Sequence, residues 1–232
     1  MGMADQSPVS PAAQPPLTRY EGAMDFDDEF RARLRDLMAW RRDVRRFRTE
    51  PLAPGTLDRL IATACLAPSV GLSQPWRFVI VESAERRRAV RDDFAAANAA
   101  ALASYDGEQA DRYAALKLAG LVEAPGHLAV FADRDSATGH RLGRRTMPET
   151  TEYSVVAAVT CMWLAARAEG LGMGWVSILN PQRIKEILDV PASWHFIGYF
   201  CLGFAEAEHA EPELERAGWE HRRAAQCFVL RR

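Results

Sequence analysis

Trp40-Arg-Arg-Asp-Val-Arg-Arg-Phe47 is the stretch around which the rest of this 232-residue chain is organised. Four arginines stand in six consecutive residues, with one acid, Asp43, among them. A guanidinium group is always charged and presents a planar fork of donors that matches phosphate oxygens. Four such groups repel one another unless an anion lies between some of them. We therefore expect the phosphate and sugar end of a nucleotide-like ligand here, although a basic helix end explains this stretch equally well.

The composition outside this stretch favours one globular domain. Residues 1–23 are rich in Pro, Ala, Ser and Gln and are predicted to form a disordered leader. Residues 24–232 are predicted to form a single domain, with a polar C-terminal arm from about residue 210. The net charge of −2 favours neither nucleic acid nor a membrane surface. The four cysteines are scattered and no apolar run reaches transmembrane length, so we expect a cytoplasmic protein without disulfides.

Helical and strand patterns alternate on both sides of the arginines. Phe30, Leu34 and Met38 share one face of a helix that leads into the stretch. Further helices are predicted over 57–67, 84–104, 109–122, 153–169 and from 181, and strands over 78–81, 128–131, 175–179 and 196–204. This alternation indicates a mixed sheet covered by helices on both faces. The helix over 153–169 is apolar nearly all round, which is typical of a helix buried in a protein core or in a dimer.

Several common catalytic patterns are missing from the sequence. Gly170-Leu-Gly172-Met-Gly174 has the glycines of a dinucleotide loop, but it closes a helix and opens a strand, so a helix cap and tight turn explain it better. The five histidines have no ligand spacing, and a catalytic metal is not expected. No Gly-x-Ser-x-Gly pattern marks a hydrolase.

Two further positions carry polar groups in unusual surroundings. Ser69, Gly71 and Gln74 lie in a loop between two prolines, where a flat ring could rest on the backbone, although a plain turn explains the loop as well. Ser177 is a lone hydroxyl in an apolar run, and in a buried strand such a hydroxyl needs a partner. That partner is more often a nearby carbonyl than a ligand.

Taken in order, four segments resemble the nitroreductase superfamily of flavin proteins, and more narrowly its 5,6-dimethylbenzimidazole synthase branch. The segments are Trp40-Arg-Arg-Asp-Val-Arg-Arg-Phe47, Ala67-Pro-Ser-Val-Gly-Leu-Ser-Gln-Pro-Trp-Arg-Phe78, Leu142-Gly-Arg-Arg-Thr-Met-Pro-Glu-Thr150 and Gly174-Trp-Val-Ser-Ile-Leu179. Generic nitroreductases commonly have Ser in place of Asp43 and Asn in place of Leu72, and both departures point to the synthase branch. Residues 98–117 would correspond to a segment that this branch adds.

The resemblance implies an α+β fold: a nitroreductase-like mixed central sheet flanked by helices, with a long buried central helix and an inserted helical lid. It also implies that reduced FMN is the substrate rather than a recycled cofactor. Dioxygen adds to the flavin, which is fragmented. The ribityl C1′ becomes a carbon of 5,6-dimethylbenzimidazole, the lower ligand of cobalamin, and the remaining sugar phosphate leaves as erythrose 4-phosphate.

The same resemblance assigns roles by position. Asp43 and Ser177 match the two functionally important side chains of the family. We interpret Asp43 as the proton-transfer group near the ribityl C1′, because a carboxylate can take a proton during oxidation at that carbon. Ser177 is interpreted as an orienting hydrogen-bond partner near the reacting part of the flavin. The flavin-binding positions implied are Arg41, Arg42, Asp43, Val44 and Arg45 for phosphate and ribityl, Ser69 and Gly71 along the ring, Lys117 and Arg145 for closing the site, and Gly174 and Ser177.

The family also implies partners. We expect a homodimer with the flavin at the subunit boundary, and a separate flavin reductase that supplies reduced FMN. The alternatives are an NAD(P)H-dependent nitro- or quinone reductase that uses FMN catalytically, and a flavin carrier without turnover. A scarcity of polar groups near the ring, with Leu72 in place of Asn, favours the synthase, because a closed apolar cavity protects a reactive intermediate from water.

Overall fold

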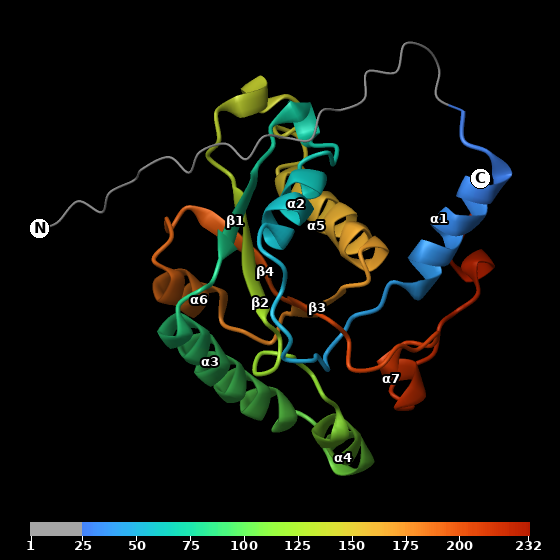
Figure 1. The fold of residues 1–232 in the computed structure, drawn as a ribbon. Coiled ribbons are helices and arrows are strands. Elements are labelled where there is room, and N and C mark those ends of the chain that lie inside the picture. Colours follow the sequence, from blue (N-terminus) through green and yellow to red (C-terminus); the bar gives the residue numbers. More distant parts are fainter. Residues whose placement is uncertain (1–24) are drawn as a thin grey trace, which may run out of the picture.

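A computed structural model describes residues 25–232 of the chain, so the predicted leader over 1–23 lies outside the described residues. Figure 1 shows a central sheet with helices on both sides. The elements in chain order are α1 (Asp28–Trp40), α2 (Thr56–Ala64), the 3-10 helix η1 (Val70–Leu72), β1 (Trp76–Ile80), α3 (Ala84–Leu102), α4 (Gly107–Ala115), β2 (Gly126–Asp133), η2 (Thr138–Arg141), α5 (Thr150–Ala168), β3 (Gly172–Val176), α6 (Pro181–Leu188), β4 (Trp194–Gly203), α7 (Glu213–Arg216) and η3 (Ala225–Phe228).

The sheet has the strand order β1-β2-β4-β3. The predicted α+β class is confirmed, but the predicted mixed pairing needs correction, because all three ladders are antiparallel. Strands β2 and β3, which precede and follow α5 in the sequence, run in the same direction. They do not pair with each other, because β4 lies between them in the sheet. In the described part of the chain, parallel pairing is limited to an isolated bridge between Asp43 and Met173.

Alternating side chains of β2 enter two different cores. Leu128, Val130 and Ala132 pack on one face with α2 and α5. Ala129 and Phe131 pack on the other face with α3 and α6. All five are fully buried, because a strand covered on both faces turns every second residue into each core. The prediction of helices on both sides of the sheet is confirmed.

Helix α5 is the long central helix that was predicted. Its side toward the sheet buries seven residues, including Val155, Val159 and Met162. Its opposite side is open in this chain, where Tyr153 is 58% and Val156 37% exposed. The helix is therefore buried on one side only, and Tyr153 and Val156 face outward.

Two predicted boundaries are wrong. The strand predicted over 175–179 is β3, which begins three residues earlier and ends at Val176. The helix predicted over 109–122 is α4, which ends at Ala115. The helix predicted from residue 181 is confirmed as α6, and it begins there because the Asn180 side chain accepts the N–H groups of Gln182 and Arg183. Among residues 25–232, no helix has the length and apolar character needed to span a membrane.

Candidate functional site

The arginine stretch leaves α1 and lies in an extended conformation along the outer edge of β3. The Val44 N–H donates to the carbonyl of Met173 over 3.1 Å. This approach leaves no room for a side chain at Gly172 or Gly174: a Cβ on Gly174 would lie 2.0 Å from the Val44 carbonyl oxygen, and one on Gly172 would lie 2.8 Å from the Val44 side chain. Gly170, with φ of 75°, is the predicted helix cap, but the other two glycines serve this close contact rather than a tight turn.

Asp43 is held at both carboxylate oxygens. Its Oδ1 accepts the backbone N–H of Trp175 over 2.8 Å, and its Oδ2 accepts Arg45 Nε over 2.9 Å. Arg45 continues to the other side and donates from Nη1 to the Lys117 carbonyl over 3.3 Å. The Arg45 side chain is 13% exposed and that of Asp43 is 31% exposed. The carboxylate is thus fixed in orientation and still reachable from the pocket that it lines.

Arg41 and Arg42 are held by groups from distant parts of the chain. The Arg41 guanidinium lies over the Trp163 ring, 4.9 Å from its centroid. Arg42 donates to the carbonyls of His209 and Ala210 in the C-terminal arm. Burial lowers the pKa of both arginines, Asp43 offsets part of this effect at Arg41, and the nearby charge of Arg222 lowers each pKa further. Mutual repulsion of this kind favours the binding of an anion between them.

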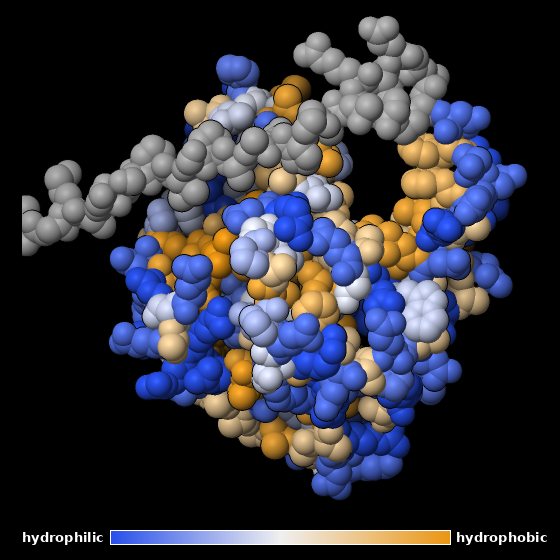
Figure 2. Space-filling model, in the orientation of Figure 1, coloured by the Kyte–Doolittle hydropathy of each residue, from blue (hydrophilic) through white to orange (hydrophobic). Residues whose placement is uncertain are grey.

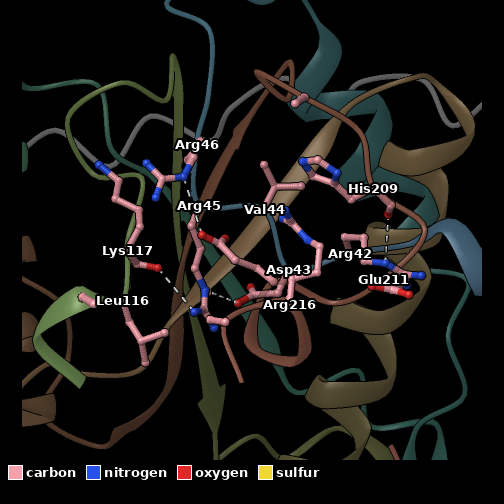
Figure 3. A pocket seen from close by; sticks show the side chains of 14 residues that line it. Arg42, Asp43, Val44, Arg45, Arg46, Leu116, Lys117, His209, Glu211 and Arg216 are labelled. Atoms are coloured by element: carbon pink, nitrogen blue, oxygen red, sulfur yellow. Dashed lines mark hydrogen bonds and ion pairs between the residues drawn. The ribbon is translucent and has the colours of Figure 1, made fainter. Parts of the chain in front are cut away.

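A pocket of about 340 Å³ opens beside this stretch (Figure 3). Its walls come from the arginine stretch, from residues 115–117 at the end of α4, and from arm residues between 207 and 217. Its charged lining residues are the cations Arg42, Arg45, Arg46, Lys117 and Arg216 and the acids Asp43, Glu211 and Glu213. Three of the cations already have acidic partners: Arg45 pairs with Asp43 at 2.9 Å, Lys117 with Glu123 at 2.7 Å and Arg46 with Glu213 at 3.5 Å. The net positive lining suits the phosphate of a flavin nucleotide.

Ser69, Gly71 and Arg145 are not brought to this pocket. Gly71 and Arg145 line a separate cavity of about 570 Å³ formed by η1 and the loop that contains η2. Those loops adjoin the end of the sheet where Trp76 pairs with Ala132, whereas Met173, next to the arginines, pairs near the Gly126 end. The two ends of β2 are roughly 20 Å apart at the usual rise per residue. In Figure 1 the two loops lie at the top, whereas the arginine stretch, in light blue, lies in the lower half beside β3.

The η1 loop is nevertheless fixed by hydrogen bonds and close packing. The Ser154 hydroxyl of α5 accepts the Val70 N–H over 3.0 Å, and the Ser69 hydroxyl accepts the Gln74 N–H over 3.1 Å. Gly71, with φ of 56°, passes so close to η2 that a Cβ would lie 3.0 Å from the Gly139 carbonyl. The Ser69 hydroxyl is therefore engaged within its own turn, as the plain-turn interpretation requires.

Comparison with known proteins agrees with this architecture. The sequence model of the nitroreductase family matches residues 38–204. This chain belongs to the nitroreductase family. A protein of Rhodospirillum rubrum named 5,6-dimethylbenzimidazole synthase is 57% identical over 198 residues, which are 85% of this chain and 94% of that protein. A Rhodobacter capsulatus protein of the same name is 47% identical over 197 residues, covering 85% of this chain and 95% of its own length. The resemblance found in the sequence is thereby confirmed.

Solved structures support the nitroreductase fold. A nitroreductase-like protein of Streptococcus mutans superposes with a TM-score of 0.65 at 18% identity, covering 86% of this chain and 98% of its own. An oxidized iodotyrosine deiodinase bound to FMN and 3-iodo-L-tyrosine superposes with a TM-score of 0.64 at 23% identity, covering 76% of this chain and 91% of its own. At these identities the likeness concerns the fold.

Ser177 and the arm differ most from what the sequence suggested for this nitroreductase-family chain. Ser177 is exposed and lies one residue past the end of β3, so it is not the buried strand hydroxyl that was predicted. The sequence did not reveal that Trp163 supports Arg41, or that Glu213 and Arg216 line the pocket. The only signal for the arm was its polarity, which indicated a segment that lies across another surface.

Proposed function

We propose that this protein is a 5,6-dimethylbenzimidazole synthase that uses dioxygen to fragment reduced FMN into 5,6-dimethylbenzimidazole and erythrose 4-phosphate. The proposal is supported by the high identity to two relatives of that name over nearly their whole lengths. The observation in the site that carries it is Asp43, a carboxylate fixed among arginines at the wall of the pocket. Reduced FMN would be the substrate and would supply the electrons that dioxygen takes up.

The arginine stretch would hold the phosphate and ribityl chain. Arg42 and Arg45 line the pocket directly, and Arg41 lies beside it on Trp163. Lys117 stands on the opposite wall and would close the pocket over the phosphate, since its backbone already contacts Arg45. Guanidinium groups in fixed positions bind phosphate without a further cost in ordering their side chains.

Asp43 would take a proton from the ribityl C1′ while the flavin is held at its phosphate end. Its two hydrogen bonds use one lone pair on each oxygen, so each oxygen keeps a second acceptor site. Ser177 would orient the reacting part of the flavin further along the same edge of the sheet. Val44 and Gly174 would contribute backbone, because their close contact shapes the floor between Asp43 and β3.

The complete site would require a homodimer. Residues assigned to the flavin ring, Ser69, Gly71 and Arg145, lie at the opposite end of the sheet from Asp43 within one chain. A second copy could bring its η1 and η2 loops to the first copy's arginines. The exposed apolar residues fit such an interface and include Leu72 at 71%, Leu142 at 71%, Met147 at 48% and Tyr153 at 58% exposed.

Helix α1 offers a second apolar face for a partner copy. It has no buried residue, although Phe30, Leu34 and Met38 share one side of it. In Figure 2 the apolar side chains of α1 face the body of the molecule across an open notch, while its outer side is hydrophilic. An amphipathic helix with an uncovered apolar side is stabilised when a partner covers it.

A separate flavin reductase would supply the reduced FMN.

One incubation tests the proposed reaction. The protein is mixed with chemically reduced FMN and air, and 5,6-dimethylbenzimidazole is sought by mass spectrometry while the flavin absorbance is followed. We expect the benzimidazole to form with permanent loss of the yellow chromophore. Rapid NADH oxidation with intact flavin would instead identify a reductase, and binding without either change would identify a carrier.

A further inference from the structure

The two outer walls of the pocket are weakly anchored segments far apart in the sequence. One wall is formed by residues 115–117 at the end of α4, and the other belongs to the arm that contains α7. Tyr113 is the one buried residue of α4, and α7 has none. Helices of this length are marginal on their own in water. The positions of both walls must therefore depend on contacts outside the main cores.

Three aromatic rings supply such contacts. Tyr105 stacks on Tyr113, with ring centroids 4.9 Å apart. Trp219 of the arm meets both rings edge-on, at 5.8 Å from Tyr105 and 6.1 Å from Tyr113. Arg112 adds a hydrogen bond from α4 to the Gly218 carbonyl over 3.4 Å. Edge-on and offset aromatic pairs of this geometry stabilise a structure by more than the burial of their apolar surface alone.

The end of α7 directs Trp219 toward these rings. The Trp219 N–H donates to the Leu214 carbonyl and the Gly218 N–H to the Glu215 carbonyl, which is the hydrogen-bond pattern of a Schellman helix end. Gly218 takes the left-handed conformation that this motif needs, with φ of 67°, and has open space where a Cβ would be. On the other side, Tyr113 is fixed by donating from its hydroxyl to Asn98 Oδ1 over 2.8 Å. Both partners of the contact are thus pre-positioned by their own segments.

We propose that Tyr105, Tyr113 and Trp219 form a clasp that couples the inserted helix α4 to the C-terminal arm, so that the two outer walls of the pocket open and close together. Trp219 does not line the pocket, so it acts as a positioning residue through α4 and α7. When the clasp is closed, Lys117 on one wall and Arg216 on the other face the arginine stretch. The effect on flavin rests on the proposed function, whereas the coupling of the two segments does not.

Hydrogen exchange on the full-length, FMN-free protein tests the coupling. In Trp219→Ala, the amides of α4 should exchange about tenfold faster, although the substitution is more than 100 residues away in the sequence. In Tyr105→Ala, the amides of α7 should respond in the same way. Trp219→Phe should restore slow exchange in α4. Phe228→Ala removes an exposed aromatic ring of the same arm that stacks on none of the three, and it should leave α4 unchanged.

The outcomes separate the clasp from the proposed function. Trp219 lies outside both core clusters, so exchange in α5 and β2 should stay slow and report an intact fold. If α4 exchanges at the wild-type rate in Trp219→Ala, the clasp does not exist. FMN release from the loaded protein, followed by flavin fluorescence, should be about tenfold faster in Trp219→Ala than in Trp219→Phe. If the wild type binds no FMN, the proposed function fails, while the exchange rates still decide the clasp.

Discussion

The backbone N–H of Trp175 donates to Asp43 Oδ1 over 2.8 Å and so joins the arginine stretch to the edge strand of the sheet. An edge strand has unpaired backbone groups on its outer side. Here the Asp43 side chain accepts the N–H of Trp175, and the Val44 N–H donates to the carbonyl of Met173. The arginine stretch therefore pairs briefly with the outer edge of β3. The same carboxylate orients Arg45. Local folding and the predicted chemistry therefore depend on one side chain.

Asp43→Asn should retain FMN binding and lose benzimidazole formation. The amide keeps the size of the side chain and one acceptor oxygen, but it cannot take a proton and cannot satisfy both Trp175 and Arg45. The lost hydrogen bond should lower the free energy of unfolding by about 1–2 kcal/mol. FMN binding is measured by fluorescence titration and product by mass spectrometry. Product at the wild-type rate would exclude the proton-transfer role.

Asp93→Ala, which removes a carboxylate acceptor elsewhere in the fold, is the stability control for this substitution. Asp93 also accepts a backbone N–H over 2.8 Å, from Asn180, but it does not line the pocket. Its replacement should lower the free energy of unfolding to a similar extent and leave product formation unchanged. Equal loss of product in both variants would show that Asp43 acts only through stability.

Gly174→Ala should weaken FMN binding by displacing the arginine stretch from β3. The added Cβ would lie 2.0 Å from the Val44 carbonyl, which is backbone and cannot rotate away. Overpacking of this kind typically costs about 1–3 kcal/mol of unfolding free energy. Gly170→Ala is the comparison: its Cβ meets open space at a positive φ, so it should lower stability by about 1–2 kcal/mol without weakening FMN binding. Equal affinities in the two variants would argue against this account.

The sequence was most informative where local composition decides structure. The cluster Arg41–Arg46 stood out because four like charges need an anion, and Asn180-Pro181 marked a helix start by its capping chemistry. The strand β3 was placed three residues too late because its first half is Gly172-Met-Gly174, and glycine is usually depleted in strands. Its glycines exist for a contact with Val44, which only the tertiary structure reveals. The misplacement of Ser177 follows from the same error.

Contacts between segments far apart in the chain could not be predicted from the sequence. Nothing in the polar arm indicated that Trp219 would meet Tyr113, or that His209 would offer its carbonyl to Arg42. Such contacts depend on how segments more than 100 residues apart fold back on one another. The separation of Gly71 from Asp43 was equally hidden, because residues that share a family's site in sequence need not share it within one chain.

The stability of the protein should fall as the pH drops below about 6.5, owing to His127. This side chain is 1% exposed, with Nδ1 2.9 Å from the Tyr199 hydroxyl and Nε2 3.0 Å from the Ala124 carbonyl. Burial, followed by the nearby charge of Arg87, lowers the pKa of His127 to about 4. The unfolded chain therefore binds a proton between pH 6.5 and 4 that the folded chain does not. The free energy of unfolding should decrease through this window by on the order of 3 kcal/mol.

Urea unfolding at a series of pH values from about 7.5 to about 4.5, which covers most of this window, measures the effect. His127→Gln should be less stable at neutral pH but should lose most of the pH dependence. His221→Gln removes an exposed histidine and should retain the wild-type slope. An unchanged slope in His127→Gln would assign the pH dependence to other groups.

Mixing two inactive variants should restore activity if each site is built from two chains. Arg45→Ala removes a cation from the pocket beside Asp43, and Arg145→Ala removes one from the cavity beside Gly71. In a mixed dimer, one site would carry both substitutions, and the other would combine an intact Arg45 from one chain with an intact Arg145 from its partner. Once each variant alone is shown to have lost activity, unfolding and refolding them together should recover about a quarter of the wild-type rate, because half of the dimers are mixed and each holds one intact site. Sites contained within single chains would stay inactive in every combination, so the absence of recovery in verified mixed dimers would contradict the shared site.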